Sequence, residues 1–146
     1  MQLIEALKAV HESGFVYNDL KLDNIMINRK NDRQNEYDFN LVLIDYGLAI
    51  EYRSDSGKHL PMEEMPEFKG NLIFASEHAL CFKRPSRRDD LLSVCYLLIY
   101  LLNECDFPLL NEYFSDKSKS YNIEEVRRFK KHCPFLRLLE NVALQP

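Results

Sequence analysis

Apolar residues near the start of the chain recur at helical spacing. Leu3, Leu7 and Val10 lie four and three positions apart, and a Ser-Gly pair follows at residues 13–14. This period predicts an amphipathic helix, and Ser-Gly is typical of a helix end. We therefore expect the first helix to finish at residues 13–14.

Two short apolar runs come next, at residues 25–27 and 41–44. They flank a polar stretch from Asn28 to Asn40 that is rich in Asn and Asp. Short apolar runs between turn-forming residues are typical of strands. We interpret them as the buried strands of a hairpin, with the polar stretch as a surface turn.

The middle of the chain has no period from Ala49 to Lys69. A loop of this length in a compact domain is more often functional than not. Beyond it lies the longest apolar run, residues 91–102, which only Ser93 interrupts. We expect a helix over about residues 88–104 that is enclosed by protein on every face.

A last helix is predicted near the C-terminus. Asn122 precedes Glu125 by three residues, as in a capping box, and the basic residues 130–132 suit a helix end. The inner face of this helix is expected to carry Ile123, Val126 and Phe129. The predicted fold class is mainly α with a small β-hairpin, in one domain over residues 1–146.

Charge and composition exclude some partners. The chain has 146 residues and a formal net charge of −4, with its basic residues scattered among acidic ones. A nucleic-acid partner is not expected, because phosphate backbones are held by clustered Lys and Arg. The apolar run is also shorter than the roughly 20 residues that span a bilayer, so a membrane partner is not expected.

The cysteines bear on where the protein resides. The four of them, Cys81, Cys95, Cys105 and Cys133, form no C-x-x-C pair. We interpret them as reduced thiols, and the N-terminus lacks the pattern of a secretory signal. Both features indicate an intracellular location, in the cytoplasm or the nucleus.

A polar cluster carries the candidate chemistry. Asp19, Lys21 and Asn24 precede the first predicted strand, and Asp45 ends the second. If the strands pair, the four side chains meet at one end of the hairpin. A carboxylate and an amide are suited to Mg²⁺ beside substrate phosphates, a role for Asn24 and Asp45. Asp19 is then free to orient a hydroxyl and Lys21 to neutralise charge, which are the requirements of phosphoryl transfer.

The alternative interpretation is that these polar residues only decorate a turn. The pattern D-x-K-x-x-N alone recurs by chance about once in several thousand positions at average residue usage. Its coupling to D-Y-G at the end of the next strand makes the functional interpretation strong.

These stretches resemble protein kinase motifs. Residues 17–24, Y-N-D-L-K-L-D-N, are similar to the catalytic loop H-R-D-x-K-x-x-N, and residues 45–47 to the metal-binding D-F-G. Residues 68–76, F-K-G-N-L-I-F-A-S, and 86–93, S-R-R-D-D-L-L-S, resemble segments of the casein kinase 1 family of serine/threonine kinases.

The resemblance implies a fold and a set of roles. The fold is a kinase C-terminal lobe with an activation segment over residues 45–77, and the substrates are ATP with Mg²⁺ and a protein Ser or Thr. The implied roles are a catalytic base at Asp19, a phosphate-contacting lysine at Lys21, and Mg²⁺ ligands at Asn24 and Asp45. Asp90 is implied to hold the backbone of the catalytic loop, with a helix N-cap as its alternative role.

Some positions depart from the family pattern. Tyr17 and Tyr46 replace His and Phe but keep a ring that can pack. Asn18 replaces the arginine that pairs with an activation-loop phosphate in many kinases, so such switching is not expected. Asn71 and Ile73 replace the family's Thr and Arg, and Ile73 cannot bind the anion of an acidic substrate. Phosphorylation of Ser54 or Ser56 is a weaker interpretation than simple exposure to solvent.

The 146 residues contain neither the glycine-rich loop G-x-G-x-x-G nor the V-A-I-K lysine that bind ATP. We expect the N-terminal lobe to be absent and the chain alone to be inactive. The lost lobe would expose an apolar face that a partner could cover. Two alternatives stay open: a non-catalytic binding module derived from a kinase, and a truncated chain that folds poorly.

Overall fold

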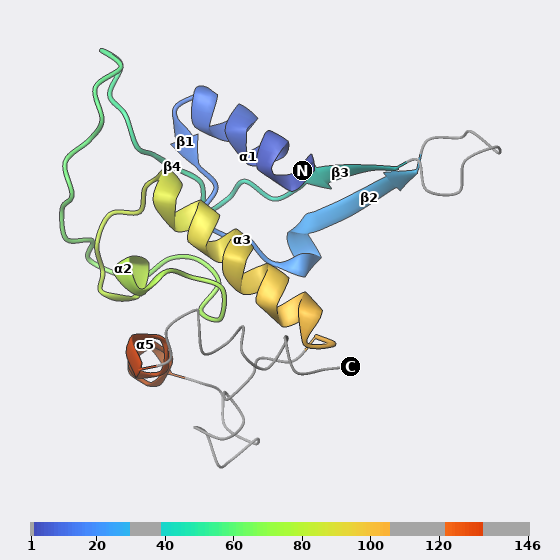
Figure 1. Ribbon diagram of the computed structural model, residues 1–146. Helices are drawn as coiled ribbons and strands as arrows, with labels where there is room; N and C mark the ends of the chain where they lie inside the picture. Colours follow the sequence, from blue (N-terminus) through green and yellow to red (C-terminus); the bar gives the residue numbers. More distant parts are fainter. Residues whose placement is uncertain (1, 30–38, 106–121, 133–146) are drawn as a thin grey trace.

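The computed structural model describes residues 2–29, 39–105 and 122–132. Figure 1 shows the long helix α3 crossing the middle of the molecule, with α1 beside it and a two-stranded hairpin projecting to one side. More of the described residues lie in helices than in strands. The elements are α1 (Gln2–Glu12), β1 (Phe15–Val16), the 3₁₀ turn η1 (Leu22–Asn24), β2 (Ile25–Arg29), β3 (Phe39–Leu43), β4 (Ile50–Glu51), α2 (Glu77–Leu80), α3 (Arg87–Leu102) and α5 (Ile123–His132).

The first helix confirms the predicted period. α1 buries Leu7 and Val10 on the face that meets the core. Its end is closed by the Ser13 hydroxyl, which donates to the Val10 carbonyl at 2.7 Å. Gly14 follows with a φ of +98°, a left-handed conformation that glycine adopts without strain.

The predicted hairpin is confirmed, but its burial is not. β2 and β3 pair antiparallel, from Ile25 opposite Leu43 to Arg29 opposite Phe39. Within residues 41–44 only Leu43 is buried, while Met26 and Ile27 are more than half exposed. The expectation of buried strands was wrong because apolar content alone does not say which face a sheet covers. Most of the expected turn between Asn28 and Asn40 lies outside the described residues.

A second pair of strands was not predicted. β1 and β4 pair antiparallel over two residues each. Strands this short show no recognisable alternation of apolar and polar residues in the sequence. β4 lies at the start of the stretch 49–69. This stretch contains no helix, and Arg53 and Glu64 each form an isolated β-bridge. The short helix α2 also escaped prediction, and Ser76 caps it by accepting from the Ala79 amide at 3.1 Å.

Helix α3 ends two residues earlier than expected and is not enclosed on every face. It buries Val94, Leu97 and Ile99 against the core. Its other face is open, since Leu98 is 50% exposed and Leu102 56% exposed. The prediction of a helix surrounded by protein was therefore wrong. Among the described residues, no helix has the length and apolar character needed to cross a membrane.

The last helix confirms its predicted cap and inner face. The Asn122 carboxamide accepts from the Glu125 amide at 2.9 Å, and the Glu125 carboxylate accepts from the Asn122 amide at 3.1 Å. Val126 and Phe129 are fully buried, Phe129 in the main hydrophobic cluster and Val126 in a second one against which Ile123 packs. α5 packs against α2. Cys81, Cys95 and Cys105 are free thiols, and Cys133 lies outside the described residues.

Candidate active site

The predicted residues of loop 17–24 come together in one place. The Asp19 carboxylate accepts from the Lys21 ammonium at 2.8 Å and from the Asn24 carboxamide nitrogen at 2.9 Å. The same nitrogen donates to the Asp19 carbonyl at 3.0 Å. Asp19 and Asn24 are buried, and η1 turns the chain so that residues 19 and 24 face each other.

The ion pair affects the lysine. The hydrogen bond from Lys21 to Asp19 raises the pKa of the Lys21 ammonium above its usual value, and Asp45 adds to the effect. Lys21 therefore stays charged at neutral pH. A fixed cation beside a buried carboxylate is an arrangement that can stabilise charge on a transferred group.

Asp45 reaches the same end of the hairpin from the other strand. The Ile44 amide donates to the Asn24 carbonyl at 3.0 Å, so the backbones of residues 24 and 45 lie close together. Asp45 has a φ of 59°, and its carboxylate accepts from the Gly47 amide at 3.1 Å. Because the Asn24 nitrogen faces Asp19, its amide oxygen points away from that carboxylate. One carboxylate and one amide oxygen are suitable donors for Mg²⁺.

Two tyrosines pack behind these groups. The rings of Tyr17 and Tyr46 meet edge to face, with centroids 5.5 Å apart. The Tyr17 hydroxyl donates to the Ile44 carbonyl, and burial raises the pKa of that phenol to about 12. The expected packing of the two rings is confirmed, and Tyr17 adds a bond that ties loop 17–24 to the end of β3.

Asp90 fixes the backbone of the loop. This carboxylate, which is 2% exposed, accepts from the amides of Tyr17 at 2.8 Å and Asn18 at 2.9 Å. His11 of α1 adds a third contact, with its Nε2 2.7 Å from the same carboxylate. The implied supporting role of Asp90 is confirmed, whereas the helix N-cap is Ser86. His11 was missed, although it lies four residues after Leu7 on the buried stripe of α1.

A second buried charge holds another segment. Lys130 of α5 is 5% exposed, and its ammonium donates to the Ile73 carbonyl at 2.6 Å and to the Ala75 carbonyl. It also lies 3.9 Å from the centre of the Tyr96 ring. Burial lowers the pKa of Lys130 well below its usual value. The sequence gives no sign of this contact, because Lys130 stands among the basic residues of an ordinary helix end.

The segment that Lys130 holds spans residues 71–76. The Asn71 carboxamide oxygen accepts from the amides of Ile73 and Phe74, each at 3.0 Å. At the other end the Ser76 hydroxyl donates to the Asp89 carboxylate at 2.5 Å. Ile73 packs against the main hydrophobic cluster, which agrees with the expectation that this position cannot bind an anion.

Comparison with known proteins identifies the family. A model of the protein kinase domain matches residues 1–141. A casein kinase 1-like protein from Oryza sativa subsp. japonica is 36% identical over 104 residues, which cover 70% of this chain and 14% of the relative. Casein kinase I homolog 2 from Schizosaccharomyces pombe is 29% identical over 155 residues, covering 95% of this chain and 35% of the relative.

A third relative is a probable serine/threonine-protein kinase from Dictyostelium discoideum. It is 36% identical over 99 residues, covering 68% of this chain and 19% of the relative. The chain thus spans between 14% and 35% of the length of these relatives. The domain match over residues 1–141 and the two casein kinase matches lead to one conclusion: the chain belongs to the protein kinase family and is a casein kinase 1-like member of it.

Proposed function

We propose that this chain is the C-terminal lobe of a serine/threonine protein kinase and carries its phosphoryl-transfer site. The proposal rests on the hydrogen bonds that Lys21 and Asn24 donate to the Asp19 carboxylate. The backbone of the loop that carries these residues is fixed by Asp90. A buried carboxylate in a rigid loop is suited to orient an attacking hydroxyl.

The proposed reaction joins a substrate hydroxyl oxygen to the γ-phosphorus of ATP and breaks the bond between that phosphorus and the β–γ bridging oxygen. Asp19 orients the hydroxyl and accepts its proton. Lys21 neutralises charge on the transferred phosphoryl group, since its pKa is raised by Asp19. ADP leaves, and the acceptor becomes a phosphorylated Ser or Thr.

A magnesium ion fits the donors on this chain. Asn24 and Asp45 would hold it at the end of the hairpin, together with phosphate oxygens of the nucleotide. Bound there, Mg²⁺ neutralises phosphate charge. The described residues contain no group of three or more His, Cys, Asp and Glu side chains that could hold a metal. The proposed site takes two ligands from this chain and the others from the nucleotide.

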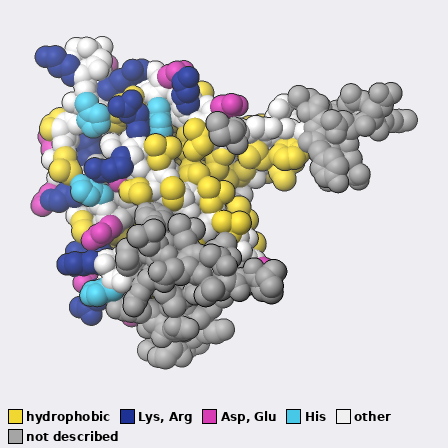
Figure 2. Space-filling view, in the orientation of Figure 1, with side chains coloured by type: hydrophobic (Ala, Val, Ile, Leu, Met, Phe, Trp, Pro, Cys, Tyr) yellow, Lys and Arg dark blue, Asp and Glu magenta, His cyan; other side chains and the backbone are white. Residues whose placement is uncertain are grey.

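A specific observation favours a second function, the non-catalytic binding module. Large apolar side chains are exposed near the proposed site: Met26 is 52% exposed, Ile27 62% and Tyr46 52%. Figure 2 shows hydrophobic side chains gathered on the hairpin side of the molecule, away from the Lys, Arg and His side chains. Such a surface fits an apolar partner, either an N-terminal kinase lobe or another protein.

A chimera separates the two functions. An N-terminal lobe from a casein kinase 1 relative is joined ahead of residue 2, and phosphate transfer from labelled ATP to casein is followed across a Mg²⁺ titration. We expect Mg²⁺-dependent transfer by the chimera, little transfer by the chain alone, and a loss of orders of magnitude in Asp45→Asn.

The control is Glu5→Gln, the same loss of charge at an exposed position on α1. It should transfer phosphate like the parent chimera. A folded chimera that binds nucleotide but transfers no phosphate would contradict the catalytic proposal and favour the binding module. Robust transfer by the chain alone would contradict the need for an N-terminal lobe.

A further inference from the structure

Asn18 stands where many kinases carry an arginine that pairs with an activation-loop phosphate. In this chain its carboxamide nitrogen donates to two backbone carbonyls, that of Leu48 at 3.1 Å and that of Lys69 at 3.2 Å. Leu48 directly follows the D-Y-G residues, and Lys69 directly precedes Gly70. One side chain therefore ties both ends of the segment 48–69 to the catalytic loop.

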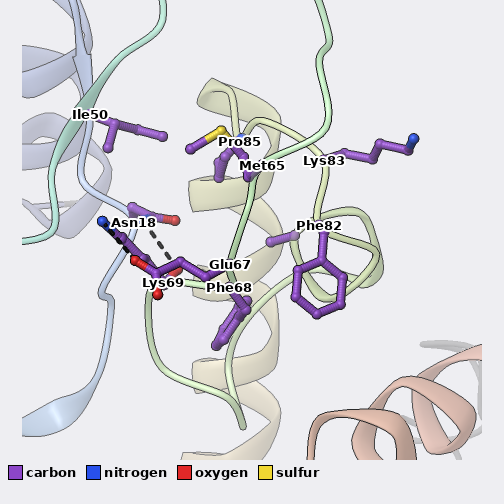
Figure 3. Close-up of a pocket in the computed structure, with 10 residues that line it drawn as sticks. Asn18, Ile50, Met65, Glu67, Phe68, Lys69, Phe82, Lys83 and Pro85 are labelled. Atoms are coloured by element: carbon purple, nitrogen blue, oxygen red, sulfur yellow. Dashed lines mark hydrogen bonds and ion pairs between the residues drawn. The ribbon is translucent and has the colours of Figure 1, made fainter.

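Figure 3 shows Asn18 and Lys69 side by side in a small pocket that Phe68 and Phe82 also line. The approach is close on the backbone side as well. A Cβ added at Gly70 would collide with the Asn18 carbonyl oxygen, and Gly70 has a φ of +127°. Position 70 therefore needs glycine for two reasons, the conformation and the space.

Asn18 is itself suited to its position. Its φ of 65° lies in the left-handed region, which asparagine adopts more readily than most residues. Its backbone amide donates to the Asp90 carboxylate at 2.9 Å, so the backbone of Asn18 is anchored to α3. The backbone of Asn18 is thus fixed to α3, while its side chain holds the segment.

Neutral hydrogen bonds also fix the rest of the segment. The Tyr52 hydroxyl donates to the His11 carbonyl at 2.8 Å, and the Tyr52 amide donates to the Gly14 carbonyl at 3.1 Å. The Met65 amide donates to the Phe82 carbonyl at 2.7 Å. These contacts join the segment to α1 and to the end of α2, and none of them needs a phosphate.

We propose that Asn18 is a positioning residue whose side chain clamps both ends of the segment 48–69 to loop 17–24 through neutral hydrogen bonds. The proposal rests on the proposed kinase function for its consequence, but the clamp is a property of the chain. An amide donor satisfies two carbonyls permanently, whereas an arginine in this place depends on the arrival of an anion. The expected consequence is weaker binding of the protein substrate when the clamp is lost.

The clamp is tested by hydrogen exchange on the full chain. Asn18→Asp keeps the size and the tolerance of positive φ but replaces the donor with an acceptor that repels both carbonyls. Loss of two hydrogen bonds should raise exchange in residues 49–69 by about tenfold and leave α3 within about twofold. Gly70→Ala should loosen the same residues without altering the Asn18 side chain. Asn103→Asp, the same change at a residue that donates to the Ile99 carbonyl, should affect only the end of α3.

Two results would overturn the clamp: unchanged exchange in residues 49–69 of folded Asn18→Asp, or an equal rise across α1 and α3. In the chimera, Asn18→Asp should raise KM for the protein substrate several-fold with little effect on KM for ATP. If every chimera is inactive, the proposed function fails, while hydrogen exchange still decides the clamp.

Discussion

Loop 17–24 and the segment 71–76 each have two backbone groups held by a buried charge on a helix, and these two charges have opposite signs. Asp90 of α3 accepts from two backbone amides and contacts His11. Lys130 of α5 donates to two backbone carbonyls and lies on the Tyr96 ring. A carboxylate can hold only donors, and an ammonium can hold only acceptors. Each loop therefore presents the backbone groups that its anchor can satisfy.

The two anchors should differ in energy. Removal of Asp90 leaves two amides and His11 without their partner, whereas removal of Lys130 leaves only carbonyls, which tolerate incomplete hydrogen bonding better. Burial also penalises the charge of Lys130, as its lowered pKa indicates. A neutral side chain of similar size therefore avoids a cost at position 130.

The largest effect is expected for Asp90→Ala. We expect the free energy of unfolding to fall by about 3–5 kcal/mol, because a hydrogen-bonded buried charge is lost and its partners stay buried. Urea unfolding followed by circular dichroism measures this change. A loss below about 1 kcal/mol would mean that Asp90 does not anchor the loop.

Leucine substitutions in the same helix show what burial contributes without charge. Replacing Leu97, which is 1% exposed, with alanine should lower the free energy of unfolding by about 2–5 kcal/mol. Leu98→Ala is the matched control, and its half-exposed side chain should cost less than about 1 kcal/mol. Equal costs for the two variants in urea unfolding would contradict the two-faced description of α3.

Lys130→Met should cost less than Asp90→Ala. The methionine keeps an unbranched apolar chain beside Tyr96 but leaves the carbonyls of Ile73 and Ala75 without a donor. We therefore expect the free energy of unfolding to fall by about 1–3 kcal/mol. Limited proteolysis should also show faster cleavage near residues 71–76. A cost larger than that of Asp90→Ala would reverse the ranking of the two anchors.

The smallest effect is a pH dependence. The folded protein lowers the pKa of Lys130 from its usual 10.5, so the unfolded chain binds more protons between the lowered pKa and 10.5. Stability contributed by this group must then rise with pH across that window. The difference in unfolding free energy between the parent and Lys130→Met should grow in favour of the parent from pH 7 towards pH 10. A difference that shrinks would contradict the direction of the shift.

Sequence patterns predicted the groups that are close along the chain. Asp19, Lys21 and Asn24 lie within six residues, and the predicted hairpin brings Asp45 to them, so spacing and strand pairing together were sufficient. Lys130 was not predictable, because its partners Ile73 and Ala75 lie more than fifty residues away and offer only backbone carbonyls. The open face of α3 was missed because an all-apolar helix gives no sign of which side the protein covers.

We propose that the loop anchored by Asp90 performs phosphoryl transfer through Asp19. The most direct measurement is the single-turnover rate of phosphate transfer to casein by the chimera and by its Asp19→Asn variant, with Glu5→Gln as the control. We expect the rate to fall by orders of magnitude in Asp19→Asn, with unchanged ATP binding and a normal rate in the control. Transfer at the parent rate by a folded Asp19→Asn protein would contradict it.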